Sequence, residues 1–246
     1  MDTPDPLIEK SMARLGHVES PAAFERPLRK DAERNRQRIL AAARDLFATR
    51  GLEPHLNDIA HHAGVGVGTI YRRFASKEEL LEALFDDAMH QLADYAEEAL
   101  RFPDSWEGFA WFMERMCELT ATDRGMREIA FSKAYGGERV CAARDRLKPL
   151  LGQLVERAQA DGHVRGDLSP TDMPLFGLLS GTVSEFTRNV DPTLWRRYVA
   201  LLLDGIRRRD DQDRLPVEAL DSDGLERAMD TWEPAGPGDG RARSAP

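Results

Sequence analysis

The sequence has little of what several functional classes require. Of 246 residues only two are cysteines, Cys117 and Cys141, which form neither a disulfide framework nor a pair spaced for a metal ion. Aromatic residues make up 7% of the chain, and no apolar run approaches the roughly 20 residues of a membrane-spanning helix. Asp2, Asp5 and Glu9 precede any apolar stretch, so we expect no signal peptide. These absences predict a cytoplasmic protein with reduced thiols and no membrane partner.

The residue patterns of common enzyme sites are also missing. The sequence contains neither an HExxH zinc motif nor a GxSxG nucleophile motif. His61 and His62 would point about 100° apart on a helix, so they cannot share a metal ion. The run Gly64–Gly68 follows no predicted strand, which argues against a nucleotide-binding loop. We therefore expect no catalytic site, no cofactor and no metal, and an enzyme built on the C-terminal part is a hypothesis that no residue set supports.

Charge is distributed unevenly along the chain. The formal net charge is −9, yet residues 26–76 carry ten basic and five acidic side chains, whereas the remainder carries 24 basic and 38 acidic ones. A basic module on an acidic body is typical of a protein that binds nucleic acid at one end. A solvated helix face is the alternative interpretation of the same basic residues.

Hydrophobic periodicity predicts helices and essentially no sheet. No stretch shows sustained apolar–polar alternation rich in Val, Ile and Thr, which is typical of strands. In the first half of the chain the apolar stripes and their breaks predict helices over 31–50, 56–63, 66–74 and 76–101. The predicted fold class is all-α, with an N-terminal three-helix helix-turn-helix domain and a C-terminal helical domain, about nine helices in all.

Two of these helices are short and are joined by a turn at Gly64, which is a helix-turn-helix pattern. The second helix, Val67–Phe74, is short enough to enter the major groove of DNA, which is about 12 Å wide. Ile70 and Phe74 would face the core, while the outer face would offer donors and small groups to DNA. Gly66 at the helix N-terminus would leave backbone N–H groups for a phosphate. Many helical hairpins share the generic pattern, so it is a weak signal by itself.

A longer stretch of the sequence gives a far more specific signal than the generic helix-turn-helix pattern. It consists of Ile39-Leu40-Ala41-Ala42-Ala43-Arg44-Asp45-Leu46-Phe47 with Gly51, followed by Asp58-Ile59-Ala60-His61-His62-Ala63-Gly64-Val65-Gly66-Val67-Gly68-Thr69-Ile70-Tyr71-Arg72-Arg73-Phe74-Ala75-Ser76-Lys77-Glu78-Glu79-Leu80. Over residues 36–84 the chain closely resembles the DNA-binding domain of TetR-family transcriptional regulators. It departs from the family pattern at two places. His55 or Asn57 would have to replace a Ser or Thr that contacts phosphate, and Gly66 stands where the family often has Ser.

The resemblance implies a set of DNA contacts. On the second short helix, the recognition helix, these are Val67, Gly68, Thr69, Tyr71, Arg72 and Arg73. Lys77 would hold a phosphate. Arg29, Lys30 and Arg34 would clamp the DNA backbone or enter the minor groove, with mobile surface charges as the alternative. A core tyrosine is the alternative for Tyr71.

The resemblance also implies a homodimer, since two recognition helices about 34 Å apart are needed to read a palindromic site. The helices expected over 171–188 and 192–208 would form the interface, with an ordinary core within one chain as the alternative. The predicted interface residues are Leu179, Val183, Phe186, Trp195, Tyr198 and Leu202. Of these, Trp195 and Tyr198 would be the anchors.

Family members usually bind a small molecule in the C-terminal domain. The aromatic- and sulfur-rich stretch 106–131 suits the lining of such a pocket, and plain core packing is the alternative for each of its residues. The predicted lining residues are Trp106, Phe109, Phe112, Met113, Met116 and Phe131, together with Phe176 from a later helix. The expected effector is therefore apolar or aromatic.

The expected organisation has four parts. These are a flexible arm over 1–28, a helix-turn-helix domain over 29–76, an effector-binding and dimerisation domain over 77–208, and an acidic, mostly disordered tail over 209–246 with one short helical turn near 225–229. The predicted function is a homodimeric repressor that binds a palindromic operator in double-stranded DNA and is released by the effector. Two alternatives are a sensor or interaction protein whose DNA-binding domain is not functional, and a transcriptional activator.

Overall fold

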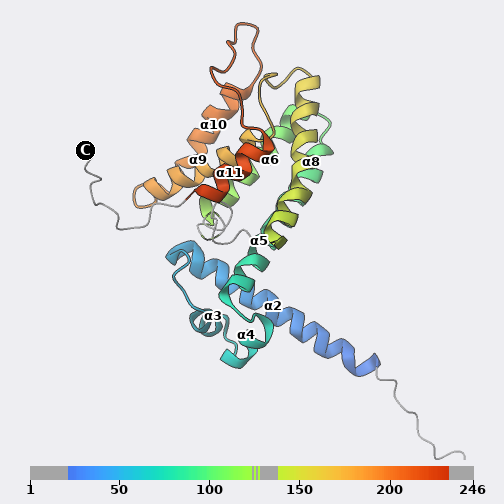
Figure 1. Ribbon diagram of the computed structural model, residues 1–246, viewed down its shortest axis with the longest axis vertical. Coiled ribbons are helices and arrows are strands. Elements are labelled where there is room, and N and C mark those ends of the chain that lie inside the picture. Colours follow the sequence, from blue (N-terminus) through green and yellow to red (C-terminus); the bar gives the residue numbers. More distant parts are fainter. Residues whose placement is uncertain (1–21, 124, 126, 128–137, 233–246) are drawn as a thin grey trace, which may run out of the picture. The chain divides into compact units, whose positions relative to one another are not determined.

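A computed structural model of the chain describes residues 22–123, 125, 127 and 138–232. These residues form the helices α2 (Ala22–Arg50), α3 (Leu56–Ala63), α4 (Val67–Arg73), α5 (Lys77–Leu100), α6 (Ser105–Thr122), α8 (Glu138–Ala160), α9 (Asp172–Thr187), α10 (Trp195–Ile206) and α11 (Ser222–Thr231) (Figure 1). Within the described ranges there is no strand, and one isolated antiparallel β-bridge joins Val164 to Arg207. The all-α prediction is confirmed. The chain divides between Arg38 and Ile39 into two compact units, and every helix after α2 belongs to the second.

The helix-turn-helix forms because its turns fall at residues that tolerate them. Gly51 follows α2 with φ of 59°, and Gly64 follows α3 with φ of 63°. Glycine adopts this left-handed conformation without the steric cost of a Cβ atom. The N–H of Val65 then donates to the carbonyl of Ala60 at 3.0 Å, which closes the end of α3. The sharp turn predicted at Gly64 is confirmed.

A capping arrangement starts α5 near the predicted residue. The Ser76 hydroxyl accepts the N–H of Glu79 at 3.3 Å. The Glu79 carboxylate in turn accepts the N–H of Ala75 at 2.7 Å, one residue earlier than in the usual capping box. From this cap α5 continues into the C-terminal helical body, where it packs against α6 and α8. α5 therefore follows the helix-turn-helix directly in the chain and also packs within the C-terminal body.

The first helix starts earlier than the sequence predicts. α2 begins at Ala22 instead of near Asp31, so the expected flexible arm is helical over 22–28. Alanine has the highest helix propensity, and Ala22 and Ala23 open the helix. Pro27 lies within the first two turns, where it removes a single internal hydrogen bond. The rest of the predicted arm, residues 1–21, lies outside the described residues.

The acidic tail also contains more helix than its composition predicts. α11 occupies ten residues of it, Ser222–Thr231, and includes the one short helical turn that the sequence predicts near 225–229. The Asp221 side chain caps α11 by accepting the N–H of Gly224 at 2.7 Å. Leu225 is buried, and Met229 and Trp232 pack against the hydrophobic core, so this end of the chain has apolar anchors on the body. Residues 233–246 of the predicted tail are beyond the described part of the chain.

Candidate DNA-binding surface and effector cavity

Helix α4 has the two faces that the sequence predicts. Ile70 is fully buried, and Phe74, which follows the helix, is nearly so. On the opposite side Val67 is 40% and Tyr71 49% exposed. A Cβ atom added at Gly68 would meet no described atom within 4 Å, so the backbone there is open to a close approach. The buried face fixes α4 on the domain, and its length of about 10 Å fits a major groove about 12 Å wide.

The polar side chains of α4 are held differently from one another. Arg72 lies back along its own helix, where Nε donates to the Gly68 carbonyl at 3.1 Å and Nη2 to the Thr69 hydroxyl at 3.3 Å. Arg73 is exposed in the last turn. Thr69 is partly buried. Arg72 must therefore give up two exposed hydrogen bonds before it can reach a base or a phosphate.

Three predicted phosphate contacts lie around the helix-turn-helix. His55 and Asn57 are exposed at the N-terminus of α3, the helix end that favours a phosphate. Lys77 is partly buried, its ammonium group donates to the carbonyl of Leu52, and it lies 5.9 Å from the centre of the Phe47 ring. Lys77 thus ties α5 to the connection between α2 and α3, and a phosphate contact by Lys77 stays a prediction.

The arm residues Arg29, Lys30 and Arg34 lie on α2, in the first unit. The exposed guanidinium of Arg34 lies 3.5 Å from the Asp31 carboxylate. The side chains of Arg29 and Lys30 lie outside the described residues. A DNA contact by any of the three stays a prediction.

The C-terminal body contains a cavity of about 520 Å³, within the range of about 300–1,000 Å³ found for small-molecule sites. Its walls come from α5, α6, α8, α9, the segments before α9 and α11, and α11 itself. Aliphatic and thioether side chains dominate the lining, which includes Met89, Leu92, Met116, Leu147, Leu151, Leu225 and Met229. Such a lining suits an apolar ligand.

The cavity is not where the sequence places it. Of the predicted lining residues that the structure describes, only Met116 lines it. Three others are completely buried in the core, namely Phe109, Phe112 and Met113. Trp106 stacks on Phe109 at 6.2 Å between ring centres, and Phe176 is half-buried and is not among the lining residues. Phe131 lies outside the described residues. The prediction was wrong for Phe109, Phe112 and Met113, because periodicity marks the buried side of a helix without separating core from cavity wall.

Sequence reasoning missed the other walls of the cavity. Arg144 and Lys148 lie one turn apart on α8 and both line it. The tail contributes a further wall through Leu220 and the first two turns of α11. The spacing of Arg144 and Lys148 beside an apolar stripe was visible in the sequence. For the tail, the sequence predicts one short helical turn near 225–229 in an otherwise disordered segment, and nothing in that pattern placed the turn at the cavity.

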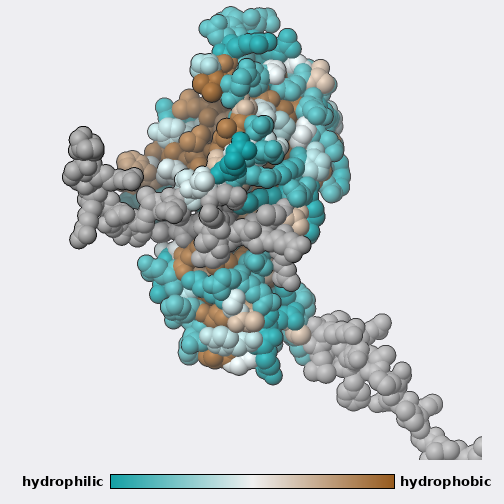
Figure 2. All heavy atoms as spheres, in the orientation of Figure 1, coloured by the Kyte–Doolittle hydropathy of each residue, from teal (hydrophilic) through white to brown (hydrophobic). Residues whose placement is uncertain are grey.

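An apolar surface covers α9 and α10, where hydrophobic side chains gather in Figure 2. Phe186 is 89% and Leu179 52% exposed, and Tyr198 is also exposed. Val183 and Leu202 are half-buried on the same two helices. Contiguous exposed apolar patches are uncommon on monomeric proteins and mark interaction surfaces.

The predicted interface anchor Trp195 is wrong. It is 3% exposed and belongs to the core of its own chain, together with Val199 and Leu203 on the same face of α10. Arg196 covers its ring, with the guanidinium carbon 4.8 Å from the ring centre. The buried and exposed faces of α10 are both apolar, so the sequence could not assign Trp195 to one of them.

The described residues contain no group of three His, Cys, Asp or Glu side chains placed to hold a metal ion, and no helix among them is long and apolar enough to cross a membrane. Cys117 is buried, and this burial raises the pKa of its thiol to about 11. Its S–H group donates to the carbonyl of Phe176 at 3.8 Å. The side chain of Cys141 lies outside the described part.

Two family models match the regions just described. Residues 39–84 match bacterial regulatory proteins of the tetR family, and residues 104–208 match the C-terminal domain of SbtR-like transcriptional regulators. A TetR transcription regulatory protein from Mycobacterium vanbaalenii, known from a crystal structure, is 32% identical, with 74% of this chain and 100% of that chain covered at a TM-score of 0.54. This chain belongs to the TetR family. A TetR regulator from Streptomyces coelicolor is 30% identical over 70% of this chain and 98% of its own, with a TM-score of 0.52.

Other TetR-family relatives match over shorter stretches or at lower identity. An HTH-type transcriptional regulator of Staphylococcus aureus is 48% identical over 54 residues, which are 22% of this chain and 29% of that relative. The chain therefore spans less than a third of the curated relatives it matches. FadR from Bacillus subtilis, crystallised with stearoyl-CoA, shares the fold at 21% identity over 69% of this chain and 98% of its own, with a TM-score of 0.54.

The two family matches cover different helices of the chain. The match at residues 39–84 contains α3 and α4 as its helix-turn-helix. The C-terminal match ends at residue 208, before α11, so the last described helix lies beyond the family domain. The family consists of transcription factors and not of enzymes.

Proposed function

We propose that this TetR-family protein is a cytoplasmic homodimeric repressor that binds a palindromic operator in double-stranded DNA and is released by a small apolar effector. In this proposal residues 29–76 form the DNA-binding domain and residues 77–208 the effector-binding and dimerisation domain. The observation that carries the proposal is the open face of α4, where Val67, Gly68 and Tyr71 are accessible while Ile70 holds the helix on the core. The basic charge of residues 26–76 supports it.

The exposed apolar face of α9 and α10 supports the homodimer. A two-fold interface uses the same patch on both subunits, so Phe186 and Leu179 of each copy would be covered by the other. Pairing two copies would present two α4 helices to successive major grooves, about 34 Å apart. A single α4 would contact too few bases to select one site in a genome.

One contact at the cavity and one at α2 support release by an effector. Thr120 lines the cavity, and its carbonyl accepts a hydrogen bond from Arg127 Nη1 at 3.0 Å. Gly125, in the same segment, lies so close to α2 that an added Cβ atom would be 2.5 Å from Cβ of Phe47. An effector that favours a non-binding geometry by about 3 kcal/mol weakens DNA binding about 150-fold.

Titration of DNA from upstream of the protein's own gene, followed by fluorescence anisotropy, tests the proposal. We expect saturable binding that weakens steeply as salt rises, because Lys and Arg side chains replace condensed counterions. The double variant Tyr71→Ala/Arg73→Ala should bind at least about 30-fold more weakly, since each lost contact costs about 1–3 kcal/mol. Arg101→Ala is the matched control, because Arg101 is an exposed arginine at the end of α5, paired with Glu97.

Circular dichroism and sedimentation should show that the double variant keeps the fold and the dimer. Unchanged affinity in the double variant, or an equal loss in Arg101→Ala, would contradict the assignment of α4 as the recognition helix.

A further inference from the structure

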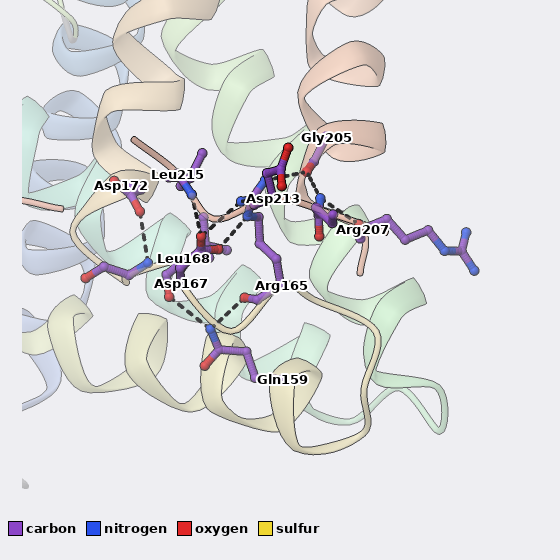
Figure 3. Close-up of polar contacts among 11 residues, drawn as sticks. Gln159, Arg165, Asp167, Leu168, Asp172, Gly205, Arg207, Asp213 and Leu215 are labelled. Atoms are coloured by element: carbon purple, nitrogen blue, oxygen red, sulfur yellow. Dashed lines mark hydrogen bonds and ion pairs between the residues drawn. The ribbon is translucent and has the colours of Figure 1, made fainter. Parts of the chain in front are cut away.

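A polar cluster, shown in Figure 3, holds the segment after residue 208, where the C-terminal family match ends, against the helical body. Arg165 Nη2 donates to Asp167 Oδ2 at 2.9 Å and to the carbonyl of Asp213 at 2.8 Å. Asp167 Oδ2 also accepts the N–H of Leu215 at 2.8 Å. The Arg165 guanidinium holds the pKa of the Asp167 carboxyl well below its usual range. One ion pair thus anchors residues 213–215, beyond the last residue of the family match.

Further hydrogen bonds fasten the segment on either side of this cluster. Gln212 Nε2 donates to the carbonyl of Gly205 at 2.9 Å. The Thr171 hydroxyl, at the start of α9, donates to the carbonyl of Leu220 at 2.7 Å. The Asp221 cap then starts α11. We call residues 209–232 the C-terminal extension, and these bonds fix its path from α10 to α11.

α11 forms one wall of the cavity. Leu225 and Met229, one turn apart, line it with apolar side chains. Glu226 lies at the same wall, and its Oε1 accepts a hydrogen bond from Lys148 Nζ at 2.6 Å. Lys148 is also 2.9 Å from Asp145, on its own helix. The extension is therefore joined to α8 by an ion pair at the cavity.

The chemistry of the lining defines the ligand class. Phe85 is the one aromatic residue among the described lining residues, and the guanidinium carbon of Arg144 lies 5.6 Å from the centre of its ring. The remaining apolar lining is aliphatic or thioether, which adapts to a flexible chain. Arg144 and Lys148 place two cations on one side of this apolar space. The hydrogen bond from Lys148 to Glu226 shows that a carboxylate can bind the Lys148 ammonium group at this wall of the cavity.

We propose that the cavity binds a linear aliphatic carboxylate whose head group replaces Glu226 on Lys148, while its chain lies between α8 and the apolar side chains of α11. This inference rests on the proposed function, because it specifies the effector of the same protein. The C-terminal extension then forms a wall of the ligand site, and its glutamate competes with the ligand for one cation. A carboxylate that enters breaks the link between α11 and α8, so the effector directly changes how the extension is held.

Calorimetric titration of the full chain with dodecanoate, and separately with dodecanol, tests this without DNA. We expect dodecanoate to bind more tightly than dodecanol, which has the same chain and no charge. Glu226→Gln should raise the affinity for dodecanoate about 2- to 5-fold, the range of partly exposed ion pairs, and Lys148→Gln should lower it by a similar factor. Neither variant should change the affinity for dodecanol. Glu218→Gln, an exposed acidic residue of the extension that lies outside this cavity, is the matched control and should leave both affinities unchanged.

Failure of dodecanoate to bind, equal affinity for acid and alcohol, or shifts of the same sign in the two variants would overturn the inference. Repeating the DNA titration in the presence of dodecanoate distinguishes failure of this inference from failure of the proposed function. Tight dodecanoate binding with unchanged DNA affinity would contradict the proposed release mechanism while the ligand class stands. DNA binding without any dodecanoate binding would contradict the ligand class alone.

Discussion

Replacing Phe186 by alanine should dissociate the proposed dimer. Phe186 lies on α9 and is 89% exposed in the single chain, so nearly its whole side chain is available for burial by a partner. Fully burying a phenylalanine side chain contributes about 1.5–3 kcal/mol. A two-fold interface contains the residue twice, so the substitution should cost about 3–6 kcal/mol. The dimer Kd should therefore rise about 10²- to 10⁴-fold.

Sedimentation equilibrium over nanomolar to micromolar concentrations measures this change. Val217→Ala is the matched control, because Val217 is 77% exposed but lies in the C-terminal extension, outside α9 and α10. The control should dimerise like the wild type, and both variants should keep the helical content of the fold. A Phe186→Ala protein with wild-type dimer affinity would refute the assignment of the α9–α10 face.

Two further predictions concern the links within the body. Gly125→Ala should lower the free energy of unfolding in urea by about 1–3 kcal/mol, because the new Cβ atom would lie 2.5 Å from Cβ of Phe47, whereas Gly205→Ala, in open space on α10, should not lower it. Equal stabilities of the two variants would contradict the close approach to α2. Asp167→Asn should lower the melting temperature above about pH 4. Since the folded pKa of Asp167 lies below its unfolded value of about 3.9, its stabilisation is lost as pH falls, so the difference from wild type should shrink in acid. A difference from wild type that is as large at pH 2 as at pH 7 would contradict the role given to the ion pair with Arg165.

The helix-turn-helix was predictable because its signals are local. Gly51 and Gly64 mark turns that need a left-handed conformation, and Ser76 marks the cap of α5. Ile70 and Phe74 recur at the spacing of one helix face, and that face is buried. Each signal depends on residues within a few positions of one another, so no knowledge of distant contacts was needed.

The cavity and the tail were not predictable in the same way. Whether a buried side chain fills the core or lines a cavity depends on what packs opposite it, which made Phe112 a wrong prediction and Met116 a lining residue. α11 lies in a segment whose acidic composition indicates disorder, and it is held by partners far away in the sequence. Its Glu226 accepts a hydrogen bond from Lys148, and its Met229 packs against the hydrophobic core.

Selection of bound sequences from a random double-stranded DNA pool tests the central claim most directly. If two copies of α4 read DNA from one homodimer, the enriched sequences should form an inverted repeat whose half-site centres lie about one helical turn, or a multiple of it, apart. The same selection with Tyr71→Ala/Arg73→Ala should yield no such motif. Absence of an enriched motif with the wild-type protein, or an enriched site without two-fold symmetry, would contradict the account.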